Sequence, residues 1–207
     1  MTTGERHTVL QTATRLFCDR GYRNTGMGDI CDACRLDIRT LHGTYPNKAA
    51  LFAAVTRPVH DVLGRTARED AGSMQCRQIL GLLLDPACLR RCLDKRLKLI
   101  EKHRNLLRLL LFRSGGYPGP DFRQTVITGW QEYISGALRL MHEQELLSAY
   151  RLSAAFGRTV GALWVQIMEE IVRHPLTTDE RERYLTELTV FLYNGNKGLF
   201  RILADAK

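Results

Sequence analysis

Cysteine side chains are the first candidates for chemistry in this chain of 207 residues. Cys31 and Cys34 have the C-x-x-C spacing of half a zinc site, but no second pair with matching spacing follows them. Cys88 and Cys92 are four residues apart and would share one face of a helix. Because free cysteine usually behaves as a small buried hydrophobic residue, we interpret these residues as reduced thiols in helices. The sequence therefore predicts no metal site.

Acidic and nucleophilic residues do not form a recognisable catalytic set either. Glu169 and Glu170 are adjacent, so on a helix they point to different sides and cannot act as a carboxylate pair. We identify no nucleophile next to a base and no glycine-rich phosphate loop. The sequence thus predicts neither catalytic residues nor a cofactor, and we expect a protein that is not an enzyme.

Composition indicates a folded chain with a basic balance. Hydrophobic residues make up 44% and charged residues 25% of the sequence, which excludes a wholly disordered chain. The formal net charge of +8 favours a polyanionic partner without establishing one. The residues from Met1 to His7 are polar, and no apolar run approaches the roughly 20 residues of a membrane span. We therefore expect a cytoplasmic protein that does not contact the membrane.

Hydrophobic residues recur with a helical period along almost the whole chain, and no segment alternates as a strand would. The first helix carries an apolar stripe that includes Val9, Ala13 and Leu16, and Gly21 is placed to end it. Further helices are expected at about 27–34, 38–44, 47–64, 75–84, 87–113, 121–147, 150–173 and 178–204. The pattern predicts an all-α protein with a three-helix head at 1–50 and a helical-bundle body at 51–207.

The two short helices at about 28–34 and 38–44 have the spacing of a helix-turn-helix, whose second helix enters the major groove of DNA. Around them stand Leu16-Phe17, Gly21-Tyr22, Ile30, Thr40-Leu41 and the run from Tyr45 through Pro46, Asn47 and Lys48 to Leu51. In this order, the first 50 residues or so resemble the N-terminal domain of TetR-family transcriptional regulators. The resemblance implies a regulator, of repressor type, that binds double-stranded DNA.

Within this motif, the residue types suit contacts with DNA. Arg39 can donate two hydrogen bonds to a guanine, and Thr40 can touch a thymine methyl or a phosphate. Lys48 stands at a helix start, where the backbone already favours a phosphate. Tyr45 has a hydroxyl that can face the DNA backbone, although a purely packing role is an equal alternative. The predicted DNA-binding residues are Thr25, Arg35, Ile38, Arg39, Thr40, His42, Thr44, Tyr45 and Lys48.

Several head residues depart from the usual family pattern. Arg35 replaces the glycine of the turn, which costs roughly 1 kcal/mol in a left-handed backbone unless the turn is reshaped. Gly26 stands where a hydroxyl N-cap is usual, and the neighbouring Thr25 is a candidate substitute. Asp37 brings a negative charge toward DNA, and residues 1–57 hold only eight basic and five acidic side chains. The alternative interpretation is a small-molecule-binding protein of the same fold whose specific DNA binding is weakened or lost.

The body contains a basic run and two helices that are rich in aromatic residues. The segment from Ala87 to Arg113 contains nine basic residues and only two acidic residues. This run is interpreted as a solvated face, with an acidic ligand, an acidic neighbouring helix or a nonspecific DNA flank as alternatives. Pockets for small molecules form between bundle helices and are mostly apolar. The residues predicted to bind an unidentified small-molecule effector are His103, Phe112, Tyr117, Trp130, Tyr133, Met141, Trp164 and Gln166.

The last two expected helices carry small and apolar residues on overlapping faces. Gly157 and Gly161 would permit close helix approach, while Leu188, Phe191 and Leu192 supply apolar area. The family resemblance implies that these helices pair with those of a second copy to form a homodimer. Two heads related by a two-fold axis would then match a pseudo-palindromic operator.

Overall fold

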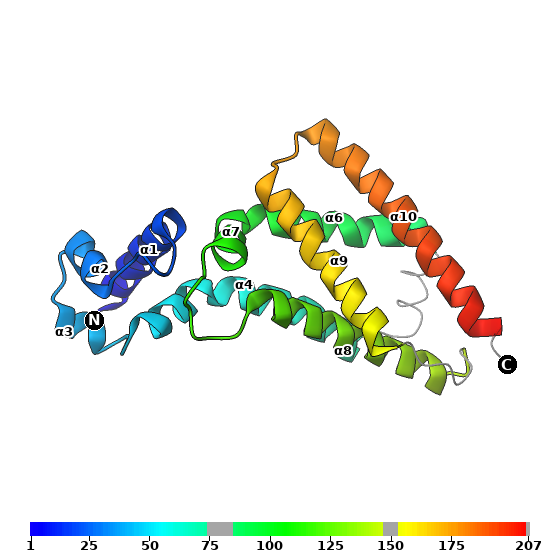
Figure 1. Cartoon of the computed structure of the whole chain (residues 1–207), viewed down its shortest axis with the longest axis horizontal. Coiled ribbons are helices and arrows are strands. Elements are labelled where there is room, and N and C mark those ends of the chain that lie inside the picture. The colour runs from blue at the N-terminus through cyan, green and yellow to red at the C-terminus, as the bar shows by residue number, and fades with distance from the viewer. Residues whose placement is uncertain (74–84, 147–152, 206–207) are drawn as a thin grey trace. The chain divides into compact units, whose positions relative to one another are not determined.

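The computed structural model describes residues 1–73, 85–146 and 153–205, and these residues form helices joined by short turns (Figure 1). The helices are α1 (Thr3–Arg20), α2 (Met27–Cys34), α3 (Ile38–His42), α4 (Lys48–Ser73), α6 (Pro86–Lys102), α7 (Arg104–Phe112), α8 (Phe122–Glu143), α9 (Ala154–Arg173) and α10 (Thr178–Asp205). The described ranges contain no strand, so the predicted all-α fold with an N-terminal helix-turn-helix is confirmed. The helix expected at 75–84 lies outside the described residues.

Two compact units divide the chain. The first contains Met1–Leu63 together with His103–Gln124, and the second contains the described parts of 64–102 and 125–207. The first unit therefore includes all of α7 in addition to α1, α2, α3 and the first part of α4. The sequence-based boundary between residues 50 and 51 differs from this division, because it leaves α7 and residues 51–63 outside the head.

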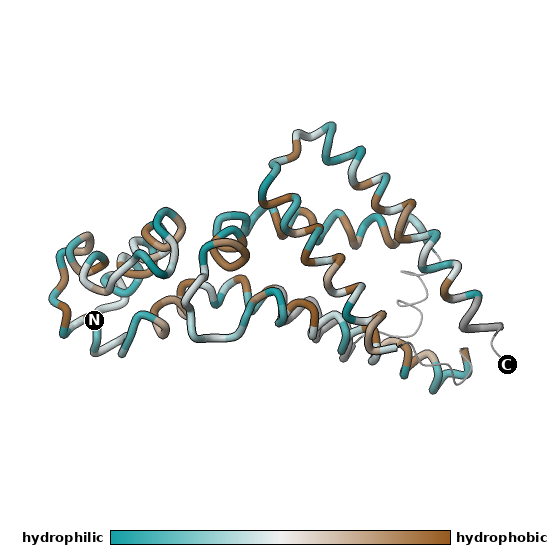
Figure 2. The backbone as a smooth tube through the Cα atoms, viewed as in Figure 1, coloured by the Kyte–Doolittle hydropathy of each residue, from teal (hydrophilic) through white to brown (hydrophobic). Residues whose placement is uncertain are grey.

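Aromatic residues form the core of the first unit. The ring of Phe52 packs edge-on against Phe17 and Tyr22, with ring centroids 5.2 and 4.9 Å apart. Tyr117 adds a fourth ring, 5.4 Å from Tyr22 and 4.6 Å from Phe52. Val9 and Ala13, in the same unit, are fully buried, as their helical spacing predicts. Hydrophobic positions recur along the helices in the same way (Figure 2).

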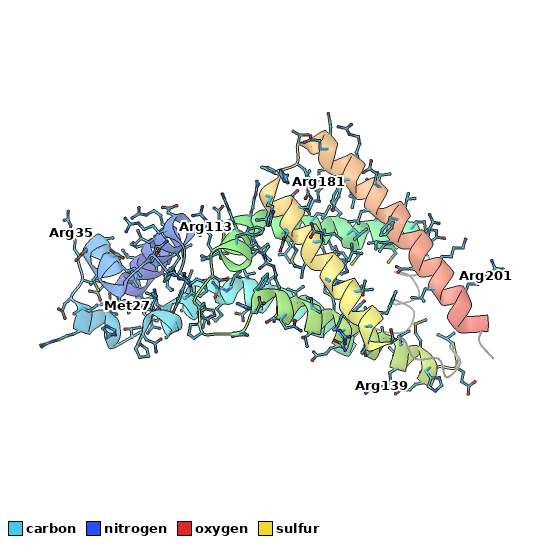
Figure 3. All side chains as sticks on the ribbon, viewed as in Figure 1. Met27, Arg35, Arg113, Arg139, Arg181 and Arg201 are labelled. Atoms are coloured by element: carbon cyan, nitrogen blue, oxygen red, sulfur yellow. The ribbon has the colours of Figure 1, made fainter. Side chains whose placement is uncertain are left out.

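Charged side chains connect α6 and α10 in the second unit. The guanidinium of Arg181, which is labelled in Figure 3, donates to Asp94 at 2.7 Å and to Glu101 at 3.1 Å. Arg90 pairs with Glu182 and also donates to Thr186 at 2.9 Å. The hydrogen bonds from Lys98 and then Arg181 hold the pKa of Asp94 below its usual range. An acidic neighbouring helix, one of the alternatives for the basic run, therefore accounts for Arg90.

Several expected boundaries differ from the structure. The expected helix at 87–113 is two helices that meet at His103, whose backbone has φ −104° and ψ 18°. No glycine or proline marks this break. The lost helical continuity is compensated by tertiary packing, because α7 buries four leucines in the first unit. The helix expected to end near residue 64 continues to Ser73 and runs through Pro58. No helix in the described part of the chain has the length and apolar character needed to cross a bilayer.

The two glycines of α9 serve packing within one chain. A Cβ on Gly161 would lie 2.8 Å from the Ile127 Cα and 2.9 Å from its carbonyl oxygen, so α8 and α9 approach closely there. A Cβ on Gly157 would lie 3.2 Å from the Gln131 side chain. The predicted close helix approach at these glycines is therefore confirmed, and the helix that approaches them is α8 of the same chain.

We expect Gly161→Ala to destabilise the protein, although alanine is the better helix former. The added methyl group would meet backbone atoms of α8, and overpacking of this kind costs about 1–3 kcal/mol. Gly136→Ala, on α8, is the matched control because a Cβ there meets nothing within 4 Å. The control is expected to raise stability by about 0.5–1 kcal/mol. Urea unfolding of both variants measures the difference, and equal stabilisation by the two changes would contradict the close α8–α9 approach.

Candidate functional site

Helix α2 begins without a hydroxyl cap. The Asp29 carboxylate accepts from the Gly26 backbone N–H at 2.6 Å, which satisfies the start of the helix from within. Thr25, the candidate substitute cap, is fully buried, and its hydroxyl hydrogen-bonds the carbonyls of Leu16 and Gly21 at 3.2 and 2.9 Å. The prediction that Thr25 caps α2 is therefore wrong. Its hydroxyl ties the segment before α2 to the end of α1, so it positions the helix-turn-helix from inside.

Arg35 makes the turn between α2 and α3 in a left-handed backbone conformation, with φ 54° and ψ 44°. Of the two alternatives for this turn, the structure therefore has the left-handed arginine rather than a reshaped turn. The turn is closed by the Leu36 N–H, which donates to the Cys31 carbonyl at 3.0 Å. The Arg35 side chain is exposed and points away from the helices (Figure 3). Arg35 therefore places an exposed cation at the C-terminal end of α2, in a backbone conformation that is unfavourable for a residue other than glycine.

Helix α3 is short and is held at its start and on its inner face. The Asp37 carboxylate caps it by accepting from the Arg39 N–H at 3.0 Å. Leu41 is fully buried and anchors the inner face. The outer face exposes Arg39, Thr40 and His42, together with Ile38, which is 39% exposed. An exposed β-branched residue and an exposed guanidinium are thus neighbours on a fixed helix.

The residues that follow α3 combine packing with capping. Tyr45 is only 8% exposed, so its ring is a core element, and Thr44 is half-buried. The Asn47 side chain accepts from the Ala50 N–H at 2.8 Å at the start of α4. The Lys48 ammonium donates to the Tyr22 carbonyl at 2.9 Å and lies 4.4 Å from the centroid of the Tyr22 ring. Lys48 therefore positions α4 against the end of α1, a role that sequence reasoning missed.

Burial raises the pKa of two side chains in the first unit. Burial and then the neighbouring Tyr117 raise the pKa of the Tyr22 hydroxyl. Burial and then the Asp32 charge raise the pKa of the Cys31 thiol, which makes it a weaker nucleophile and metal ligand. Across residues 1–73, 85–146 and 153–205, no three His, Cys, Asp or Glu side chains gather as a metal site would require.

The residues predicted to bind an effector fall in both compact units. His103, Phe112 and Tyr117 belong to the first unit, and Tyr117 packs in the aromatic cluster with Tyr22 and Phe52. The second unit holds Trp130, Tyr133, Met141, Trp164 and Gln166. Within it, Met141 is 1% exposed, whereas Gln166 lies on the exposed side of α9.

Three residues of the second unit that were predicted to bind an effector do come together. The indoles of Trp130 and Trp164 stack with centroids 4.6 Å apart and an interplanar angle of 2°, and Tyr133 packs edge-on against Trp130. The Arg96 guanidinium lies 4.8 Å from the Trp130 centroid and 5.5 Å from that of Trp164. Sequence reasoning missed Arg96, because its place in a basic run carries no signal of an aromatic contact.

Comparisons with known proteins agree with this geometry. Residues 9–55 match the family model described as "Bacterial regulatory proteins, tetR family". The fold resembles that of native NalD, the secondary repressor of the MexAB-OprM multidrug efflux pump in Pseudomonas aeruginosa, at 18% identity with a TM-score of 0.59, covering 91% of this chain and 96% of that chain. No curated protein sequence matches this chain.

Two further solved structures share the fold at 18% identity. One is a TetR-family transcriptional regulator (ECA1819) from Pectobacterium atrosepticum, with a TM-score of 0.54 and coverage of 93% of this chain and 96% of that one. The other is the TetR-family regulator PfmR from Thermus thermophilus, with a TM-score of 0.53 and coverage of 100% and 98%. The family match lies on the α1–α4 segment that positions the exposed face of α3, so the N-terminal segment of this chain is similar to the DNA-binding region of tetR-family regulatory proteins, and the chain as a whole shares the fold of solved members of that family.

Proposed function

We propose that this protein is a ligand-responsive repressor that binds a pseudo-palindromic operator as a homodimer and is released by a small molecule. The observation that carries the proposal is α3, which is capped by Asp37, anchored by Leu41 and exposed at Arg39 and Thr40. A major groove admits a helix of this kind, and arginine and threonine suit guanine and thymine edges. Repression is also the role of NalD, which shares the fold.

The charged side chains around α3 include an acid as well as cations, which favours sequence-specific DNA contacts over binding by a strongly basic surface. One carboxylate oxygen of Asp37 is occupied by the Arg39 N–H, so the acid serves the helix while adding repulsion toward phosphates. Arg35 and Arg39 are exposed on either side of it in the sequence. The Lys48 ammonium has three hydrogens, and its bonds to the Tyr22 and Arg23 carbonyls leave one donor for a phosphate. We therefore propose DNA contacts from Arg35, Ile38, Arg39, Thr40, His42 and Lys48, with Thr25 and Tyr45 as positioning residues.

The homodimer is proposed through α9 and α10. Phe156, Val190 and Phe191 are 40%, 55% and 63% exposed, and these are large apolar side chains on the two helices. A second copy that covers them would bury this area in an isologous interface. Leu188, by contrast, is only 8% exposed within its own chain, so it belongs to the core of the second unit.

Selection of genomic fragments with the purified protein tests the function, followed by a screen for compounds that release the selected duplex. We expect a defined footprint and an affinity that falls steeply with salt, because phosphate contacts release counterions. A protein that binds compounds but gives no footprint would instead be the small-molecule-binding protein with lost DNA recognition. The altered turn at Arg35 and the acid at Asp37 are the features that favour this alternative.

Arg39→Ala and Lys48→Ala should weaken operator binding in different ways. Loss of Arg39 is expected to cost about 1–3 kcal/mol and to relax preference at one base position. Loss of Lys48 should weaken all sequences about equally and lower the salt slope by about one. Arg57→Ala, an exposed charge on α4, is the control for net charge. Binding titrations on the operator and on single-base variants measure these effects, and a sequence-independent loss from Arg39→Ala would contradict base reading.

Phe191→Arg should dissociate the dimer without unfolding the chain, because the side chain is exposed in the monomer. Burying an unpaired charge in the interface is expected to cost about 3 kcal/mol, roughly 100-fold in the dimer dissociation constant. Phe191→Leu keeps an apolar contact and is the control. Sedimentation velocity measures the oligomeric state, and a dimer that survives the Phe191→Arg change would place the interface elsewhere.

A compound that releases DNA should bind less tightly when the operator is present. Linkage requires that the two ligands weaken each other by the same factor, about 5–150-fold for a coupling of 1–3 kcal/mol. Trp130 and Trp164 stack in the second unit, so their fluorescence is a suitable reporter of compound binding. Titration with and without the operator duplex measures the factor. Tight compound binding with an unchanged operator affinity would contradict the proposed release mechanism.

A further inference from the structure

We propose that Arg113 is the positioning residue that makes α7 move as one body with the DNA-binding helices. It lies after the last residue of α7 and beside the C-terminal end of α1, all within the first compact unit (Figure 3). The consequence for regulation rests on the proposed function, whereas the coupling itself is a property of the fold.

Arg113 completes α1 through its backbone and its side chain together. Gly21 ends α1 with φ 82°, and the following Tyr22 N–H donates to the Arg113 carbonyl at 2.9 Å instead of continuing the helix. The Cys18 and Asp19 carbonyls are thereby left at the end of α1, and the Arg113 guanidinium donates to both, at 2.9 and 2.5 Å. A cation at this end also suits the helix dipole. One residue thus supplies both the acceptor and the donors that the helix end needs.

Further contacts around Arg113 hold α1 and α7 together. A Cβ on Gly21 would lie 3.2 Å from the Arg113 carbonyl oxygen, so the backbones meet closely. Four residues further on, Tyr117 packs against Tyr22 in the aromatic cluster. At the opposite end of α7, the Cys18 thiol lies 3.6 Å from the Asn105 carbonyl. The contacts therefore extend along α7 rather than stopping at Arg113.

The chain connects α7 covalently to the second unit, so the Arg113 contact can take part in regulation. The chain passes between the two compact units at 63–64, at 102–103 and at 124–125, so α4 is one of three covalent links and not the only one. Helix α6, which ends at Lys102, is tied to α10 by Arg181, and α7 begins two residues later. A shift of α6 caused by an effector would reach α7 directly. Arg113 would then transmit it to α1 and the helix-turn-helix.

Native-state hydrogen exchange in low urea tests the coupling without DNA. In the wild type, amides at the end of α1 and in α7 are expected to open together as one unit. Arg113→Gln should speed exchange at residues 18–25 by about tenfold or more while α9 and α10 are unchanged. Arg108→Gln is the matched control, since it removes an exposed cation from α7, the helix that Arg113 follows. Unchanged exchange in Arg113→Gln, or an equal increase in both compact units, would overturn the proposal.

Two additions keep the experiment decisive. Both bonds to α1 come from one guanidinium nitrogen, Nη1. If Arg113→Gln does not fold, Arg113→Lys is the substitute: its ammonium is one bond shorter and cannot keep the full contact, so exchange at the same amides should be faster than in the wild type. With the selected operator duplex, DNA should slow exchange in α7 of the wild type but not in α7 of Arg113→Gln. A wild-type protein that binds no duplex would refute the proposed function, while the DNA-free comparison would still decide the role of Arg113.

Discussion

The C-terminal end of α1 is the point at which the contacts of the first compact unit converge. Gly21 turns the chain out of the helix, and the side chains of Thr25, Lys48 and Arg113 then each bond a carbonyl between residues 16 and 23. Thr25 stands just before α2, Lys48 is the first residue of α4, and Arg113 follows the last residue of α7. The satisfaction of a few carbonyl oxygens therefore fixes the elements that surround the recognition helix, because buried backbone polar groups are costly to leave unpaired.

This constraint explains how a helix of five residues can present a fixed surface. Helix α3 is too short to be stable alone, since isolated short helices are marginal in water. Its position depends on the Asp37 cap, on the buried Leu41 and on the left-handed Arg35 before it. Each of these works only if α2 and α4 are already held against α1. The exposed pair Ile38 and Arg39 is thus oriented by interactions made behind the solvent face.

Local signals in the sequence predicted much of the fold, and interactions between distant residues account for the rest. Asp37 and Asn47 are caps that a pattern of neighbouring residues reveals, and the helical periodicity located most helices. The roles of Lys48 and Arg113 depend on carbonyls 26 and 95 residues away, which no local pattern indicates. The break at His103 has no glycine or proline. The sequence predicts a close helix approach at Gly161, but composition does not say which helix is the neighbour.

A hydroxyl-radical footprint on the selected operator tests the central claim most directly. If α3 of each subunit enters the major groove, two protected half-sites related by a two-fold axis should appear about one helical turn, roughly 34 Å or 10 base pairs, apart or at a multiple of this spacing. Protection should disappear when an effector is added. A single or diffuse protected region, with no symmetric half-sites at any salt concentration, would contradict the account.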